Sequence, residues 1–325
     1  MHMLTTEQIL TYLQLDGIGN SKVFELCKHA IKNRIELEDP SDMADYIRMC
    51  IDKKIVTRYS VKRYGEIDVD SLDKASSKAR NIMNRSWEAG IGIVSYYDND
   101  FPEQLENIVD EEGKPANPLV IYYKGNLSAI PRYGIALIGT REPTPEGIRA
   151  GEYFGEKFAE KGLNIISGLA LGCDASGHRG ALKANGFTTA FLAHGLDTVY
   201  PSENEALANE IVEKGGLLIS EYPIGTPPMA NFFVTRDRLQ SGMADATLVI
   251  QTGTTGGTMH AVTSTIQAQK LLYAVTYRGD VNQADKVQGN AMLINSRKAI
   301  PLTSGDIDAV LEQIKRPSDL FSAKP

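Results

Sequence analysis

Two glycine-containing segments each follow a short apolar run, and both have the composition of an anion-binding loop. Residues 139–141 read Gly-Thr-Arg directly after the apolar run 135–138, and residues 167–172 read Ser-Gly-Leu-Ala-Leu-Gly directly after Ile166. Small residues let a phosphate approach backbone N–H groups, and the guanidinium of Arg141 is a permanently charged fork that suits phosphate. The sequence therefore predicts that these loops bind an oxyanion.

A βαβ unit is expected to position the two loops. The wholly apolar run 135–138 is typical of a strand buried on both faces of a parallel sheet. Thr144 and Pro145 supply an N-cap and a first helical residue, and Phe154 and Phe158 supply an apolar stripe. Because ligands bind beyond the carboxyl ends of parallel strands, both loops should face one crevice.

Strand-like and helix-like segments continue to alternate beyond this unit. That alternation predicts an α/β fold, a doubly wound, mostly parallel sheet with helices on both faces. Residues 1–85 instead look helical, and their Gly-Ile-Gly turn at 17–19 suits either a helix-hairpin-helix (or SAM-like) phosphate contact or a plain turn between packed helices. The expected organisation is a helical domain at 1–85, the sheet domain at 86–300, and a C-terminal helix and tail at 301–325. The further segments expected are strands at 188–193, 217–220, 247–251 and 271–275, and helices at 203–214, 235–243 and 257–270.

Composition narrows the class of protein. The 325 residues carry a net charge of −7, which disfavours a surface coated in basic charge but leaves room for a local basic groove. No apolar run approaches the roughly 20 residues of a membrane span, and the N-terminal residues do not resemble a signal peptide. The three cysteines are scattered, so reduced thiols and a cytoplasmic location are expected.

One pair of polar residues could support the structure of the crevice. Asp174 and His178 are four residues apart on one predicted helix face, which favours a hydrogen-bonded pair that fixes the helix start, with direct ligand contact as the second interpretation. No companion ligands have metal-site spacing, so no metal is expected. Asp174 and His178 are therefore assigned as structural support of the pocket.

An aromatic pair precedes two arginines in the segment 232–238. Phe232 or Phe233 could stack on bases while Arg236 or Arg238 meets phosphate; the alternative is a core Phe pair and a salt-bridged helix start. Residues 253–258 read Gly-Thr-Thr-Gly-Gly-Thr between a strand and a helix, so their N–H groups could also hold a phosphate.

Catalytic constellations are not expected. The glycine loops lack the GxGxxG dinucleotide fingerprint and the P-loop lysine, which disfavours NAD binding and nucleoside triphosphate hydrolysis. No nucleophile, base and orienting group assemble from the sequence. We therefore expect a binding protein that is not an enzyme and that needs no cofactor.

The order of these motifs resembles the DNA-processing protein A (DprA/Smf) family. The most specific piece is residues 167–174 with His178. The other matching pieces are Phe-Pro-Glu-Gln-Leu at 101–105, Ile-Gly-Thr-Arg at 138–141, Ser-Glu-Tyr-Pro at 220–223, the arginine segment 233–242, Gly-Gly-Thr at 256–258 and Gly-Asn at 289–290.

The resemblance implies an extended Rossmann-like domain that binds single-stranded DNA as a homodimer and loads a RecA-type recombinase during natural transformation. Asp237 stands where the family usually has Asn, and Gln251 where it usually has an acid. The alternatives are a Rossmann-like protein that binds nucleotides or cleaves N-glycosidic bonds, and a divergent DprA-like protein in phage defence.

The DNA-binding residues predicted from the loops and the resemblance share a place at strand ends or on the arginine helix. Binding is expected to be independent of base sequence, with stacking on a Phe ring. The predicted set is Gly139, Thr140, Arg141, Ser167, Gly168, Leu169, Ala170, Gly172, Phe232, Phe233, Arg236, Arg238, Gly256 and Gly257.

Overall fold

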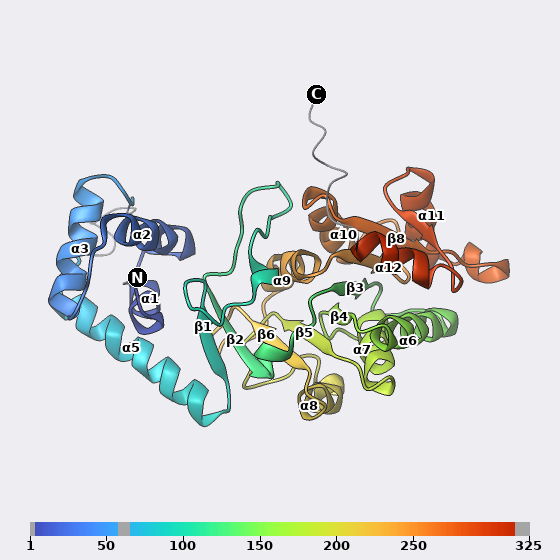
Figure 1. Ribbon diagram of the computed structural model, residues 1–325, viewed down its shortest axis with the longest axis horizontal. Coiled ribbons are helices and arrows are strands. Elements are labelled where there is room, and N and C mark those ends of the chain that lie inside the picture. The colour runs from blue at the N-terminus through green and yellow to red at the C-terminus, as the bar shows by residue number, and fades with distance from the viewer. Residues whose placement is uncertain (1–3, 58–65, 316–325) are drawn as a thin grey trace. The chain divides into compact units, whose positions relative to one another are not determined.

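The computed structural model describes residues 4–57 and 66–315, and the chain divides into two compact units (Figure 1). The first unit comprises residues 1–101 and 118–122, and the second comprises residues 102–117 and 123–325. The domain limit expected at residue 85 lies inside helix α5 (Val69–Glu88), so this helix belongs to the first unit along its whole length.

Helices dominate the first unit. The hydroxyl of Thr5 accepts the N–H of Gln8, and the Gln8 side chain accepts the N–H of Thr5, which forms a complete capping box. Ile18, in the Gly-Ile-Gly turn, is buried, as a turn between two packed helices requires. The elements of this unit are α1 (Thr6–Leu13), α2 (Asn20–Asn33), α3 (Pro40–Asp52), α5, β1 (Gly92–Ser95) and the start of β2 (Val120–Gly125).

Seven strands lie wholly within the second unit and pair in parallel throughout. Their order is β6-β5-β4-β3-β7-β8-β9, so β3 has β4 on one side and β7 on the other. The predicted α/β fold class is confirmed. The strands are β3 (Gly134–Ile138), β4 (Asn164–Ser167), β5 (Thr188–Leu192), β6 (Leu217–Ser220), β7 (Ala246–Val249), β8 (Leu271–Val275) and β9 (Ile300–Leu302).

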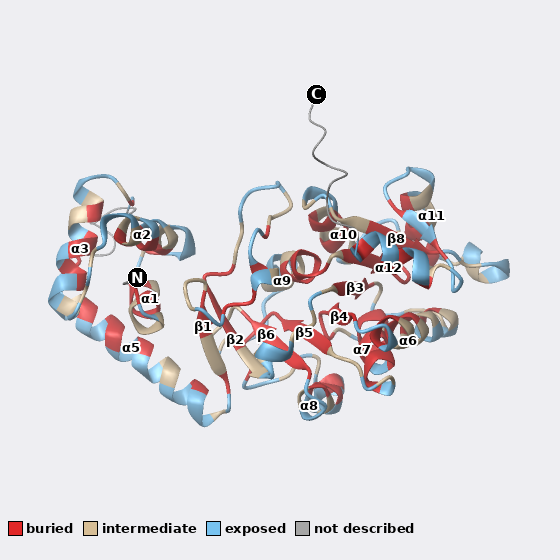
Figure 2. Cartoon of the chain, in the orientation of Figure 1, coloured by how far each residue is buried: buried red, intermediate tan, exposed pale blue. Residues whose placement is uncertain are grey.

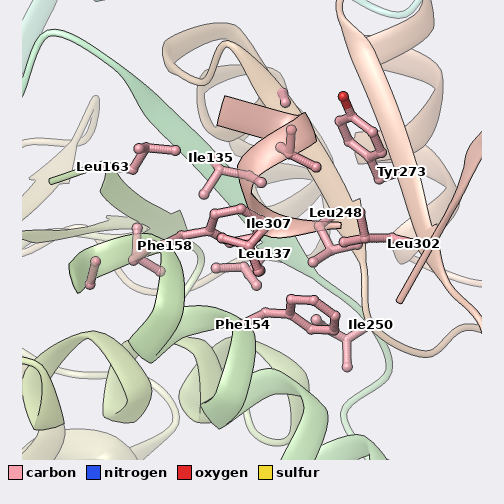
Figure 3. Packing of buried hydrophobic residues seen from close by; sticks show 14 of the residues in the cluster. Ile135, Leu137, Phe154, Phe158, Leu163, Leu248, Ile250, Tyr273, Leu302 and Ile307 are labelled. Atoms are coloured by element: carbon pink, nitrogen blue, oxygen red, sulfur yellow. The ribbon is translucent and has the colours of Figure 1, made fainter. Parts of the chain in front are cut away.

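Helices cover both faces of this sheet. Figure 3 shows Phe154 and Phe158 packed against Ile135 and Leu137, in a buried cluster that also includes Ile307. On the opposite face, the Thr265 hydroxyl lies 2.9 Å from that of Thr247. Figure 2 shows the consequence, since β4, β5 and β6 are buried along their lengths. The helices of this unit are α6 (Pro145–Glu160), α7 (Cys173–Lys183), α8 (Glu205–Glu213), α9 (Ala230–Met243), α10 (Thr258–Gln267), α11 (Gln288–Asn295) and α12 (Ile307–Lys315).

The start of α6 follows the predicted caps. The Thr144 hydroxyl accepts the N–H of Gly147, and Pro145 occupies the first turn, where a missing N–H costs nothing. Its C-terminal end is followed by Gly162 at φ +81°, a conformation that favours glycine. The helix is therefore defined at both ends by its local sequence.

Other boundaries differ from the expectations. The helix expected from 235 begins at Ala230, without a side-chain cap, because Met229 precedes it. The helix expected from 203 begins at Glu205, after a 3₁₀ turn over Ser202–Asn204. Strand β9 and helix α11 were not predicted.

Within the described residues, no helix is both long and apolar enough to cross a membrane.

The α6–α7 contact is close enough to require glycine. A Cβ atom on Gly180 of α7 would lie 2.2 Å from the carbonyl oxygen of Glu152 in α6. We expect Gly180→Ala to lower the free energy of unfolding by ~1–3 kcal/mol, since the helices must separate. Gly305→Ala is the control, because the nearest atom to its Cβ would be 3.8 Å away. Chemical denaturation measures both variants, and equal stability of the two would contradict the packing argument.

Candidate nucleic-acid interface

A pocket of about 780 Å³ opens in the second unit at the carboxyl ends of β3 and β7. Five segments line it: the loop after β3, the start of α7 with the loop before it, Tyr200 in the loop after β5, helix α9 with the residues before it, and the segment from the end of β7 into α10. Sequence reasoning placed the site at these strand ends. The predicted residues that line it are Gly139, Thr140, Arg141, Ala170, Asp174, Phe233, Arg236, Gly256 and Gly257.

Seven predicted residues do not line the pocket. Their side chains or backbones instead contact other parts of the protein around the pocket. These residues are Ser167, Gly168, Leu169, Gly172, Phe232, Arg238 and His178.

The loop before α7 folds around the carboxylate of Asp174. Its Oδ2 accepts the N–H of Gly168 at 3.0 Å and that of Ala170 at 3.4 Å. Leu169, between them, is fully buried at φ +58°. These N–H groups, predicted to hold a ligand, are thus already satisfied inside the protein. Burial raises the pKa of Asp174, while the Arg236 charge and the two hydrogen bonds oppose that rise.

The loop after β3 is held in the same way by Gln251. The Thr140 N–H donates to the Gln251 carbonyl at 2.7 Å, and the Gln251 amide both accepts from the Thr144 N–H and donates to the Thr144 hydroxyl. Gln251 is fully buried, so these bonds fix both ends of a short segment that displays Arg141. The first loop contributes an exposed guanidinium rather than the predicted N–H of Thr140.

His178 does not pair with Asp174, which corrects the predicted hydrogen-bonded pair. Its Nδ1 lies 2.7 Å from the hydroxyl of Thr188, and that hydroxyl donates its proton to the carbonyl of Ile165. Nδ1 must therefore carry the proton in this contact. Burial and the nearby charge of Arg236 lower the pKa of His178 to about 3, so the ring is neutral. Its role is to join α7 to the sheet.

Arg238 and Phe232 form contacts away from the pocket. Both guanidinium Nη atoms of Arg238 donate to Glu221 at 2.7 Å, and its Nε donates to the carbonyl of Ala116. The Phe232 ring stacks on Tyr222 with centroids 4.1 Å apart. The salt-bridge and packing alternative therefore holds for these two residues, and the open choice between the two Phe rings falls on Phe233.

Phe233 is a half-buried residue whose ring has two guanidinium groups close to it. The Cζ of Arg141 lies 5.6 Å from its centroid and that of Arg236 lies 6.0 Å away, distances typical of cation–π contacts. Arg236 is only 5% exposed, and its Nη1 donates to the carbonyl of Phe191 at 2.6 Å. Tyr200, 47% exposed, is 5.7 Å from the same ring. The pocket therefore offers one exposed cation, Arg141, one buried cation, Arg236, and an aromatic ring.

Helix α10 supplies the available N–H groups. Gly257 occupies its N-cap position without a side-chain cap, and Gly256 precedes it at φ +120°. Among the described residues, the N–H groups of Gly256, Gly257 and Thr258 have no hydrogen-bond acceptor. A helix N-terminus with unsatisfied donors stabilises an anion, so this edge of the pocket suits a phosphate.

An acidic group lies within the same pocket. The Oδ1 of Asp237 accepts from the Gln240 amide at 2.9 Å and lies 3.3 Å from the Nε of Arg236. Burial raises the pKa of Asp237 to about 6, although Arg236 lowers it in part. Gln240 and His260 also line the pocket and were missed, although Gln240 lies one helical turn after Arg236 on α9 and could have been placed from that spacing.

The acidic and histidine side chains around the pocket bear on whether a metal ion could bind there. Across residues 4–57 and 66–315, no group of three or more His, Cys, Asp or Glu side chains could hold a metal ion. The Nδ1 of His260 lies 2.7 Å from Glu111. The arrangement is suited to holding an anionic, aromatic ligand.

A model of the family described as DNA recombination-mediator protein A matches residues 92–315. The chain belongs to this family. The DprA/Smf resemblance inferred from the motifs is thereby confirmed. Protein Smf of Escherichia coli is 33% identical over 54% of this chain and 45% of its own length, and Protein Smf of Synechocystis is 32% identical over 68% and 57%. The chain thus spans about half the length of these two DprA/Smf relatives.

Two solved DprA structures are similar to the chain. DNA processing protein A from Streptococcus pneumoniae matches with a TM-score of 0.72 at 22% identity, over 97% of this chain and all of that one, which supports the DprA fold. That from Helicobacter pylori, described for its single-stranded DNA binding mode, matches with a TM-score of 0.58 at 25% identity, over 69% of this chain and 96% of that one.

The raised pKa of Asp237 leads to a prediction about how the free energy of unfolding depends on pH. A carboxyl whose pKa is higher in the folded than in the unfolded chain destabilises the fold above pH 6, and this cost disappears as the pH falls toward 3.8. Asp237→Asn removes the charge and keeps an acceptor for Gln240. We expect it to stabilise the protein at pH 7.5, by at most on the order of 3 kcal/mol, with the gain fading by pH 4.

Denaturation of both proteins between pH 4 and 8 measures this effect. Glu142→Gln, at an 83% exposed side chain, is the comparison variant. Lys286 lowers the pKa of Glu142, so this variant should lose stability at pH 7.5, opposite in sign to Asp237→Asn. A gain for Asp237→Asn that is equal at every pH would contradict the assigned cause.

Proposed function

We propose that this chain is a single-stranded DNA-binding recombination mediator whose strand enters the pocket between β3 and β7. The observation that carries the proposal is the Phe233 ring, which has the guanidinium groups of Arg141 and Arg236 within about 6 Å of its centroid and shares its pocket with the open N-terminus of α10. An aromatic face and a phosphate-binding edge in one pocket suit a base and its adjoining phosphate. A duplex would bind less well, since its stacked bases cannot reach the ring.

Further parts of the proposal rest on membership of the family. We infer that the chain acts without catalysis and in the cytoplasm, as a homodimer that loads a RecA-type recombinase during natural transformation. The binding residues retained are Arg141, Phe233, Arg236, Gly256 and Gly257. Light scattering of the chain with and without oligo-dT tests the dimer, and strand exchange by a RecA-type recombinase with added chain tests loading.

A small-nucleotide binder is the second candidate. The pocket volume of about 780 Å³ lies in the range of small-ligand sites, and only one of its lining arginines is exposed. A mononucleotide needs one phosphate contact, whereas a strand needs several. Competition between oligo-dT and mononucleotides distinguishes them, since a strand-binding protein should prefer the oligonucleotide by orders of magnitude.

Stacking on Phe233 gives the first functional prediction. We expect Phe233→Ala to weaken oligo-dT binding by ~1–3 kcal/mol, because the base loses its platform. Phe232→Ala is the matched control, since that ring stacks on Tyr222 outside the pocket and should leave the affinity unchanged. Fluorescence anisotropy measures both; a loss confined to the Phe232 variant would place the platform elsewhere.

Charge at Arg141 gives the second functional prediction. Arg141→Gln should weaken binding on the order of tenfold, as a charge-assisted contact is worth ~1.5–3 kcal/mol, and should lower the salt slope by ~0.7. Arg149→Gln is the control, because Arg149 is exposed on α6 and lies outside the pocket lining. A salt titration of each variant measures the slope of log affinity against log salt concentration. Equal slopes for the two variants would show that Arg141 does not contact phosphate.

A further inference from the structure

The carboxylate of Asp237 is unexpected in a pocket that binds a polyanion, because it repels phosphate groups. Its Oδ1 is already engaged by Gln240 and Arg236. Its Oδ2 has no hydrogen-bond partner among the residues that the structure describes, and the side chain keeps 15% of its surface exposed within the lining. One carboxylate oxygen is therefore available to a ligand as an acceptor.

The charged groups near Asp237 do not offset its negative charge enough for a phosphate to bind beside it. Arg236 is buried, and its Nη1 is committed to the Phe191 carbonyl. His260 pairs with Glu111, which adds a second carboxylate nearby. A phosphate beside Asp237 would be repelled, whereas the N-terminus of α10 accepts one without that penalty. The group that meets Asp237 must instead donate hydrogen bonds.

We propose that Asp237 reads the edge of a nucleobase stacked on Phe233 and selects guanine. The inference rests on the proposed single-stranded DNA binding. Unpaired bases are recognised by stacking on aromatic side chains and by hydrogen bonds to their Watson–Crick edges. Guanine presents two adjacent donors, N1–H and the N2 amino group, which can both point at the one free carboxylate oxygen, Oδ2. Adenine and cytosine present one amino donor, and thymine flanks its single N–H with two carbonyl oxygens that repel the carboxylate.

Asp237 would thus modify the sequence-independent binding expected from the sequence. Stacking and phosphate capture accept any base, while the carboxylate ranks bases by the donors on their edge. The expected order of affinity is guanine first, adenine and cytosine next, and thymine last. Replacing thymine with guanine should raise the affinity on the order of tenfold, near the lower end of what two hydrogen bonds to a base edge contribute to discrimination.

Single substitutions within one strand test the order. The probes are a 12-mer of dT and the same strand with one central dG, dA or deoxyinosine, which avoids the self-association of oligo-dG. Deoxyinosine keeps the N1–H of guanine and lacks its N2 amino group, so it should bind between dG and dT. Anisotropy at pH 7.5 and fixed salt measures each strand.

Two variants separate the carboxylate from the general charge of the pocket. Asp237→Asn should bring the dG and dT strands to nearly equal affinity. Glu142→Gln removes a lining carboxylate that pairs with Lys286, and it should shift all strands together while keeping their ratio. Circular dichroism confirms that both variants are folded.

The outcomes distinguish the two proposals. Binding of all strands with equal affinity by the unmodified protein overturns guanine selection and leaves the proposed function standing. A dG preference that persists in Asp237→Asn overturns the role of Asp237. Absence of binding to every strand overturns the proposed function itself and the base-edge inference with it. A preference that is lost in Asp237→Asn alone supports the inference.

Discussion

The position of β3 between β4 and β7 is the constraint on which the candidate site depends. Chain order runs one way across the sheet from β3 through β4, β5 and β6, and the other way through β7, β8 and β9. The loops that leave β3 and β7 therefore diverge to opposite faces and leave a crevice between them. The loop carrying Arg141, the N-terminus of α10 and helix α9 all meet at this crevice because of that reversal.

Buried polar side chains decide which backbone groups remain open to a ligand. The Asp174 carboxylate accepts N–H groups of one loop that looks like a phosphate loop in the sequence. In the other such loop, the backbone carbonyl of Gln251 accepts the Thr140 N–H and its side chain accepts the Thr144 N–H. The third loop, at the start of α10, has no such side chain. A glycine-rich segment is thus an anion site only where no internal acceptor reaches its donors first. The N–H groups described above are consequently already bonded in the first two loops, and those at the start of α10 are open to a ligand.

Local signals in the sequence were sufficient for much of the fold. The N-cap Thr144, the apolar strand β3 and the alternation of elements could be predicted because each depends on neighbours within a few residues. The start of α9 could not, because Arg236 and Gln240 are buried beside Leu239, and the helix has no purely apolar face. The roles of Arg238 and Asp174 depend on partners that only the folded chain brings close, such as Glu221.

Gly168 and Arg236 lie so close together that one residue restricts the other. A Cβ atom at residue 168 would lie 1.8 Å from the Nη1 of Arg236, and that nitrogen is fixed by the carbonyl of Phe191. A larger residue at 168 would displace the guanidinium from its place beside Phe233. In this chain the two positions are therefore coupled: a larger residue at 168 needs a shorter side chain at 236 to be accommodated.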